Sequence, residues 1–248
     1  NLASIGGQDI VVLTDMSRER QLDRLKSEFI ATAAHELNTP LCSVMGFTEL
    51  LLNSDDLERA TQKEYLAIIL SKTETLEDII EDLLALSRAE GGQKVAIERE
   101  PCDLRKLIDS LLGSYRKEHR TRPFHLDWPD QESESLSLDR IKIGQALENL
   151  LSNAIKFSPA NTPIEIHVTS TEEHVSISVK DQGKGLSSKQ VSKAFDKFYR
   201  ADMSNTSIQG LGLGLSITKE IIEAHGGTIQ IESSLGHGAI VCVTLPKT

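Results

Sequence analysis

Apolar residues between positions 17 and 90 recur every three or four residues, which is the spacing of one face of an α-helix. Within this region, glycine and proline occur only at Pro40 and Gly46, so little interrupts the pattern. The pattern predicts two long helices. The predicted seam of the first helix consists of Leu22, Leu25, Phe29, Thr32, Glu36, Val44, Phe47 and Leu51. The predicted seam of the second helix consists of Tyr65, Ile69, Lys72, Leu76, Ile80, Leu83 and Ser87.

A polar stretch, "NSDDLERAT" at 53–61, separates the two helical patterns, and "EGGQK" at 90–94 ends the second one with glycines. Two helices joined by a short connection pack as an antiparallel hairpin. A single hairpin buries only one stripe on each helix. We therefore expect a second copy of the chain to cover the rest, giving a homodimeric four-helix bundle.

The remaining sequence contains both the three-to-four-residue spacing of helices and the two-residue alternation of strands. The run "DIVVLTDM" at 9–16 is rich in β-branched residues and typical of a strand. Further strands are expected at 95–100, 122–128, 164–170, 174–181, 228–233 and 239–245, and helices at 103–119, 139–157 and 212–225. A turn at 171–173 joins two of the strands as a hairpin. Neighbouring strands with helices on one face indicate a two-layer α/β sandwich.

Composition limits the function classes. The net charge of −10 disfavours nonspecific binding to nucleic acid or to anionic lipid, and no apolar run reaches the roughly 20 residues that span a bilayer. Cys42, Cys102 and Cys242 lie far apart without a C-x-x-C pair, which favours buried free thiols in a reducing, cytoplasmic compartment. The chain begins at Asn1, so we expect a fragment whose full-length protein carries any inner-membrane anchor in a missing N-terminal part.

One histidine, His35, has neighbours that can take part in catalysis. It begins the stretch "HELNTP" at 35–40. A zinc-protease helix is excluded because the second histidine of H-E-x-x-H is replaced by Thr39. An ordinary histidine is mostly neutral at pH 7 and can act as a nucleophile. Glu36 can accept one ring N–H of His35, and Thr39 lies one turn further on the same face, where it can position water or a phosphoryl group.

Pro40 falls inside this helix, where a proline costs about 3 kcal/mol. It removes one backbone N–H and frees the carbonyl of Glu36 from its usual partner. We expect a bend or a soft point in the helix just beside His35.

Glycine clusters mark a second candidate site. In "DQGKGL" at 181–186, Gly183 and Gly185 permit a turn with close backbone approach, and Asp181 can accept from an exocyclic amine such as that of adenine. No P-loop, dinucleotide-binding fingerprint or protein-kinase motif is present.

In "GLGLGL" at 210–215, Gly210, Gly212 and Gly214 lead into a helix whose free N–H groups can bind phosphates. A further "GHG" occurs at 236–238. The polar segment 195–209 between the clusters is long enough to be a mobile lid, and its Arg200 can clamp a phosphate.

The helix containing "ENLLSNAIKFSP" at 148–159 completes this site. Asn149 and Asn153 lie one turn apart and offer amide oxygens to Mg²⁺, while Lys156 offers an ammonium group to phosphate. Together with the glycine clusters, this face indicates a pocket for a magnesium nucleotide.

The motifs together resemble the sensor histidine kinases of two-component systems, over nearly the whole chain. The stretch "HELNTPL" resembles their phospho-acceptor box, 148–159 their N box, "DQGKG" their G1 box, "FDKFYR" their F box and "GLGLGL" their G2 box. The resemblance implies a dimerisation and histidine phosphotransfer domain at 17–93 and an ATP-binding domain of the gyrase and Hsp90 type at 94–248. The stretch "TDMSRER" at 14–20 resembles the junction after a PAS sensor domain, which implies that 1–16 is the end of a truncated PAS domain.

The resemblance also implies roles for individual residues. ATP with Mg²⁺ would phosphorylate His35, with Glu36 as the base, and the phosphoryl group would pass to an aspartate of a response regulator. Thr39 would support dephosphorylation of that regulator. The nucleotide contacts implied are Mg²⁺ on Asn149 and Asn153, phosphates on Lys156 and Arg200, adenine stacking on Phe157, and the adenine amine on Asp181.

Three alternatives remain open: a fragment that acts mainly as a phosphatase, a nucleotide-binding scaffold without activity, and a gyrase-like ATPase. Gyrase-type ATPases carry a glutamate where Asn149 stands, and an asparagine cannot act as a general base. The chain departs from the family at Asn38, where arginine is common, at Leu211, where a small residue is usual, and at Gln182, where asparagine is frequent.

Overall fold

The computed structural model describes residues 2–5, 8–11, 17–54, 57–90, 95–128, 135–201 and 211–247. At the N-terminus, strands β1 (Leu2–Ile5) and β2 (Gln8–Val11) form a two-stranded antiparallel sheet. The strand expected at 9–16 therefore coincides with β2 as far as Val11, and its remaining residues lie outside the described chain.

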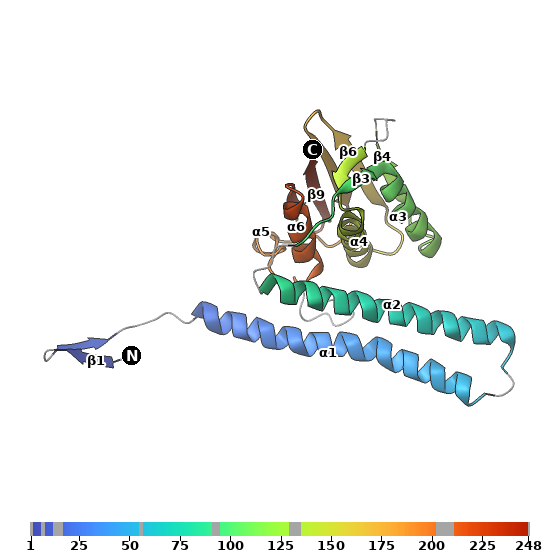
Figure 1. The fold of residues 1–248 in the computed structure, drawn as a ribbon, viewed down its shortest axis with the longest axis horizontal. Helices are drawn as coiled ribbons and strands as arrows, with labels where there is room; N and C mark the ends of the chain where they lie inside the picture. Colours follow the sequence, from blue (N-terminus) through green and yellow to red (C-terminus); the bar gives the residue numbers. More distant parts are fainter. Residues whose placement is uncertain are drawn as a thin grey trace.

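Two long helices, α1 (Ser17–Leu52) and α2 (Arg59–Glu90), pack side by side as the predicted hairpin (Figure 1). Helix α1 continues through Pro40, whose side chain is buried. The Phe47 and Tyr65 rings meet across the hairpin with their centroids 5.2 Å apart, as expected for seam positions. No helix among the described residues carries an apolar stretch that could cross a membrane.

Among the predicted seam positions near the end of α2, Leu83 is half-buried, whereas Ile80 and Ser87 are exposed in the single chain. Ile79 and Leu83 pack against the buried core, which includes Ala33 of α1, and α2 also contacts helix α6 (Gly214–Ala224). Helix α2 thus contacts two neighbouring helices, α1 and α6.

The region after the hairpin is the predicted two-layer α/β sandwich. Its further strands are β3 (Glu100–Asp103), β4 (Phe124–Asp127), β5 (Ser135–Leu138), β6 (Ile164–Ser170), β7 (His174–Lys180), β8 (Thr228–Ser233) and β9 (Ala239–Pro246). Its further helices are α3 (Leu104–Glu118), α4 (Arg140–Phe157) and the short α5 (Ser188–Val191).

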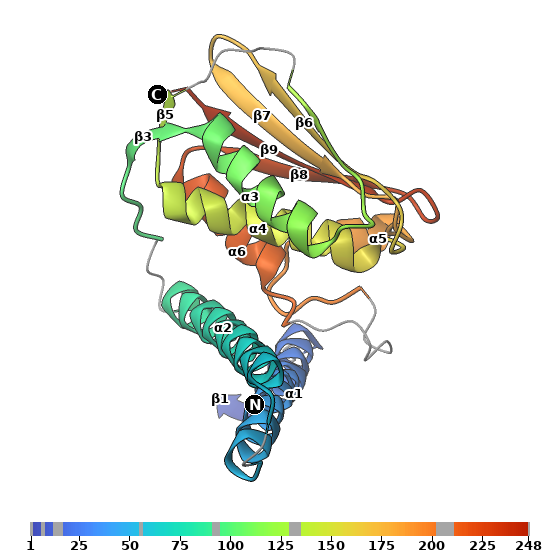
Figure 2. The same cartoon turned by 90° about the vertical axis from the view of Figure 1, so that its right-hand side faces the viewer.

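The main sheet has five strands in the order β4-β6-β7-β9-β8, with only β4 and β6 parallel. Helices α3, α4 and α6 cover the face of this sheet that is turned toward the hairpin (Figure 2). Alternate residues of β6 and β7 are buried against them, which is the period-two pattern of a sheet with one covered face. Leu112 and Leu150, both fully buried, represent the helix side of this core.

The strand predicted at 95–100 is wrong, because β3 begins only at Glu100. Its partner β5 pairs Leu138 with Glu100, and the next residue, Asp139, caps α4 instead of continuing the ladder. Strand β5 itself was not predicted, since four residues alternating between serine and leucine give too short a signal. The other predicted strands and helices of this region are confirmed to within about two residues, as is the turn at 171–173, where the Thr171 N–H donates to the His174 carbonyl.

His225 is fully buried at the end of α6 and joins three parts of the domain. The Asp139 backbone N–H donates to its Nε2 at 3.0 Å, so Nδ1 carries the proton and donates to the Ile221 carbonyl at 2.8 Å. The neutral ring therefore fixes α4 to α6. The Arg99 guanidinium donates to the His225 carbonyl, and the Glu98 N–H donates to the Asp139 carboxylate. These two bonds attach the segment before β3 to the same junction of α4 and α6.

The three cysteines are free, but only Cys102 is fully buried. Burial raises the pKa of the Cys102 and Cys242 thiols, which keeps them protonated and unreactive. Cys42 is exposed on α1, so the expectation that all three thiols are buried is wrong for this residue.

Candidate functional site

His35 and Thr39 lie one turn apart on the same face of α1, and both side chains are exposed. The Thr39 hydroxyl donates to the His35 carbonyl oxygen at 3.0 Å, which fixes its orientation beside the histidine. The imidazole is therefore accessible to a nucleotide or to a partner protein.

Glu36 is half-buried and brings a negative charge toward the last turn of α4. Burial lowers the pKa of Lys156, the Glu36 carboxylate opposes this change, and the Arg200 guanidinium adds to it. The Glu36 carboxylate, on the helix that carries His35, thus lies within electrostatic range of Lys156, which in turn lies within range of Arg200. A phosphate beside these cations would replace Glu36 as their counter-charge.

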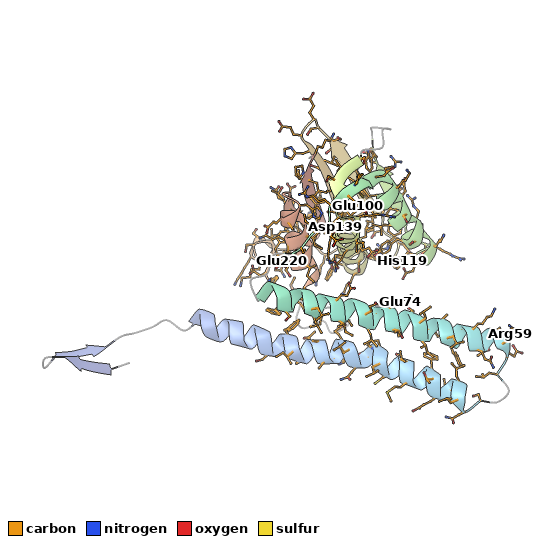
Figure 3. The ribbon with its side chains drawn as sticks, viewed as in Figure 1. Arg59, Glu74, Glu100, His119, Asp139 and Glu220 are labelled. Atoms are coloured by element: carbon orange, nitrogen blue, oxygen red, sulfur yellow. The ribbon has the colours of Figure 1, made fainter. Side chains whose placement is uncertain are left out.

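An aromatic contact joins α1 to the segment that follows α5. The rings of Phe29 and Phe198 lie 4.6 Å apart between centroids, although Phe29 is nearly two turns before His35. Phe198 has a backbone φ of +68°, a conformation that residues with a Cβ rarely adopt. The adjacent Lys197 pairs with Glu220 of α6 at 2.7 Å, so this segment is held from both sides (Figure 3 labels Glu220).

Asn149 and Asn153 lie on one face of α4, one turn apart, and both are partly exposed. At the start of α6, a Cβ on Gly214 would lie only 3.2 Å from the Asn149 amide oxygen. The glycine therefore lets the free N–H end of α6 approach the asparagine face closely. Helix N-termini attract phosphate, and amide oxygens suit Mg²⁺.

Asp181 is buried at the end of β7, and burial raises the pKa of its carboxyl group. Hydrogen bonds from Gly183, Ala239 and Ser158 oppose that rise, and the Gly183 N–H reaches the carboxylate at 2.7 Å. A Cβ at Gly183 would collide with the Phe157 carbonyl oxygen, so only glycine lets this loop lie against the end of α4. The structure thus brings Asp181 and Phe157 together.

The second glycine cluster meets Arg200. Gly212 has a φ of +71°, and a Cβ there would lie 3.0 Å from the Arg200 Cγ, so a larger residue would displace the arginine. Gly185 lies in the same loop as Gly183. Gly210 and the part of the expected lid from 202 to 209 lie outside the described residues.

Comparison with known proteins shows which families the helical hairpin and the α/β domain resemble. Residues 25–92 match the His Kinase A (phospho-acceptor) domain, and 138–248 match the histidine kinase-, DNA gyrase B-, and HSP90-like ATPase family. The catalytic domain of histidine kinase ThkA is 30% identical over 61% of this chain and 97% of that chain, with a TM-score of 0.54. This chain belongs to the sensor histidine kinases.

Other sensor kinases match along more of the chain. Sensor protein SrrB of Staphylococcus aureus is 33% identical over 98% of this chain and 42% of SrrB, so the chain spans less than half of that relative. Full-length ShkA, in complex with AMPPNP, is 25% identical over 91% of this chain and 46% of that chain, with a TM-score of 0.63. ThkA in complex with the response regulator protein TrrA is 28% identical over 94% of this chain and 65% of that chain, with a TM-score of 0.59.

The described residues of the ATP-binding region offer amide oxygens, from Asn149 and Asn153, as possible ligands for a metal ion. No group of three or more His, Cys, Asp or Glu side chains that could bind a metal occurs among the described residues. The two α4 asparagines fit Mg²⁺ as neutral oxygen ligands, provided that nucleotide phosphates supply the remaining charge.

Two residues of this sensor kinase site went unnoticed in the sequence. Ser158 follows Phe157 at the end of the N box, and Arg122 lies far earlier, just before β4. Neither residue stands in a local pattern that indicates a function. A serine before a proline usually marks the end of a helix, and a single arginine usually lies on the surface. Their importance comes from contacts between segments distant in sequence.

Proposed function

We propose that this chain is the kinase core of a two-component sensor, which uses Mg-ATP to phosphorylate His35 and passes the phosphoryl group to an aspartate of a response regulator. The observation that carries the proposal is the exposed His35 on α1 with Glu36 beside it, because the Glu36 carboxylate lies within electrostatic range of Lys156 at the end of α4. In the reaction, one ring nitrogen of His35 forms a bond to the γ-phosphorus and ADP leaves with the bridging oxygen. Glu36 takes the proton from the other ring nitrogen.

The pocket residues then have distinct roles. Asp181 accepts from the adenine amine, Phe157 packs on the ring, and Lys156 and Arg200 bind phosphates. The glycines Gly183, Gly185, Gly210, Gly212 and Gly214 allow close backbone approach. Asn149 and Asn153 would hold Mg²⁺, which would supply positive charge to the phosphates of the bound nucleotide.

Two other functions, a gyrase-like ATPase and a silent scaffold, have less support from the residues present. A gyrase-like ATPase needs a base at position 149, and the asparagine there cannot activate water. ATP should therefore persist until a histidine reaches it. A silent scaffold would not need an accessible His35 together with Asn153 and Asp181, all of which are present.

Incubation with γ-labelled ATP and Mg²⁺ tests the proposal. The protein should acquire a label that survives alkali and is lost in acid, because a phosphorus–nitrogen bond is labile to acid. Label from α-labelled ATP should not be incorporated. An unlabelled protein, or an acid-stable label, would contradict a histidine kinase.

A phosphatase activity toward the regulator is a second proposal, and the exposed Thr39 hydroxyl beside His35 supports it. Thr39→Ala should slow the loss of phosphate from a phosphorylated regulator about tenfold, because a hydroxyl that positions water is lost. Autophosphorylation should change much less. Thr48→Ala is the matched control, since the exposed Thr48 makes the same bond to the carbonyl four residues earlier, at 2.7 Å. Equal dephosphorylation rates in the two variants would exclude this role.

We also infer that the chain forms a homodimer through its helices. The hairpin leaves large apolar side chains exposed, namely Ile30, Leu41, Met45, Leu50 and Leu52 on α1, and Leu66, Leu70, Ile80 and Leu84 on α2. Several are spaced by four, which forms a second apolar stripe that a second copy can cover.

Leu70→Glu, at a side chain 60% exposed, should shift the protein from dimer to monomer in sedimentation at micromolar concentration. Leu235→Glu is the matched control, because Leu235 is 64% exposed but lies outside the hairpin. A wild-type protein that sediments as a 27.3 kDa monomer would contradict the dimer.

We place the dimerisation and phosphotransfer domain at 17–93, the catalytic domain at 94–248 and the end of a PAS domain at 1–16. The complex of ThkA with TrrA supports a response-regulator receiver domain as the partner of the hairpin. Since both ATP and such regulators are cytoplasmic, we infer that this region works in the cytoplasm, with any membrane anchor elsewhere in the full-length protein.

A further inference from the structure

Arg122 is a buried arginine whose hydrogen bonds all go to backbone carbonyl groups. Its side chain lies in the loop before β4, and the residue is only 7% exposed. One guanidinium nitrogen donates to the Thr162 carbonyl at 3.1 Å, and another donates to the Ile155 and Ser158 carbonyls, both at 3.3 Å. Burial lowers the pKa of this guanidinium, so its charge is held inside the protein at some cost.

The three carbonyls belong to the end of α4 and the loop after it. The last carbonyls of a helix have no intrahelical donor, and a cation there also meets the negative end of the helix dipole. Arg122 therefore fixes the backbone of Ser158, the residue that caps α4. A lysine could not take the same position, because its single nitrogen cannot stand where both donating guanidinium nitrogens lie.

The Ser158 side chain continues the connection into the nucleotide pocket. Its hydroxyl oxygen accepts from the Gln182 backbone N–H at 3.3 Å, which holds the residue directly after Asp181, and the same hydroxyl lowers the pKa of the Asp181 carboxyl group. The Gly183 N–H, at 2.7 Å, and the Ala239 backbone also support that carboxylate. A continuous path thus runs from Arg122 through the end of α4 to Asp181.

We propose that Ser158, held in place by Arg122, is a positioning residue that aims the Asp181 carboxylate at the adenine amine and so sets the preference for adenine over guanine. The inference rests on the proposed function, since it requires ATP in this pocket. Adenine presents an amine at the position where guanine presents a carbonyl oxygen. A carboxylate accepts only, so it binds the first and repels the second, provided that its lone pairs keep their direction.

Without the Ser158 hydroxyl, the carboxylate can turn away from the base. ATP then loses a hydrogen bond and GTP loses a repulsion, so the two affinities should move toward each other. A serine that served stability alone would lower the melting temperature without changing this ratio.

The experiment measures dissociation constants for ATP and GTP, together with the KM and maximal rate of His35 labelling. Ser158→Ala should raise the dissociation constant and KM for ATP about tenfold and narrow the ATP-over-GTP preference, with a smaller change in the maximal rate. Ser158→Thr, which keeps the hydroxyl, should restore both values. Ser114→Ala is the matched control, because Ser114 is exposed on α3 and bonds only to its own helix, at the Ser110 carbonyl.

Arg122→Lys provides an independent second variant and should narrow the same preference. If Ser158→Ala is folded by circular dichroism and keeps the wild-type ratio, the inference fails while the kinase assignment stands. If Ser158→Ala does not fold, an unchanged ratio in Arg122→Lys decides against it. A wild-type protein that binds no ATP would overturn the proposed function and this inference together.

Discussion

His35→Gln should abolish the acid-labile label from γ-labelled ATP, while ATP affinity stays within about twofold of wild type, as expected for an exposed substitution. Glutamine keeps a polar side chain of similar size, but its amide nitrogen has no free lone pair with which to attack phosphorus. His35 is exposed on α1, so its replacement removes no packing in the described chain. The loss should therefore be chemical and nearly complete.

His125→Gln is the matched control, because His125 is an exposed histidine on β4, within the ATP-binding region. It should label like the wild type. Label that persists in His35→Gln would show that another residue accepts the phosphoryl group. Loss of ATP binding together with label would instead place His35 in the nucleotide pocket.

Elements with a long, regular pattern were predictable. Helices α1 and α2 follow from apolar spacing over more than 30 residues each, and β6 and β7 from clean alternation of seven residues each. The strand expected at 95–100 was wrong because its start depends on a neighbour distant in sequence. Strand β3 begins only where the short β5 pairs with it.

The residues of the candidate site likewise include some that the sequence could predict and some that it could not. His35, Asn149 and Asp181 stand in motifs in which a few adjacent residue types indicate one chemistry. Arg122 acts through carbonyls some 33 to 40 residues away, and a carbonyl has no residue identity that a sequence could reveal. The contact between Phe29 and Phe198 likewise depends on how the hairpin packs against the ATP-binding region, which local patterns do not encode.

The buried carboxylate allows binding and stability to be separated. Burial raises the pKa of Asp181, which means that the folded protein disfavours its charge. Asp181→Asn removes that charge, so the melting temperature should stay the same or rise. A residue retained against its folding cost is expected to serve a ligand, and the variant tests this directly.

Asp181→Asn should weaken ATP binding on the order of a hundredfold, because a charge-assisted hydrogen bond is replaced by a repulsive contact. The Gly183 N–H donates to the carboxylate at 2.7 Å, so the amide oxygen of asparagine must take that position. Its NH₂ group then faces the adenine amine, a donor against a donor. The same NH₂ suits the carbonyl of GTP, so GTP should gain relative to ATP. Asp109→Asn, at an exposed aspartate on α3, should leave both affinities unchanged. Unchanged ATP binding in Asp181→Asn would mean that adenine lies elsewhere, whereas weaker binding with no gain for GTP would mean that the asparagine amide is not oriented by Gly183.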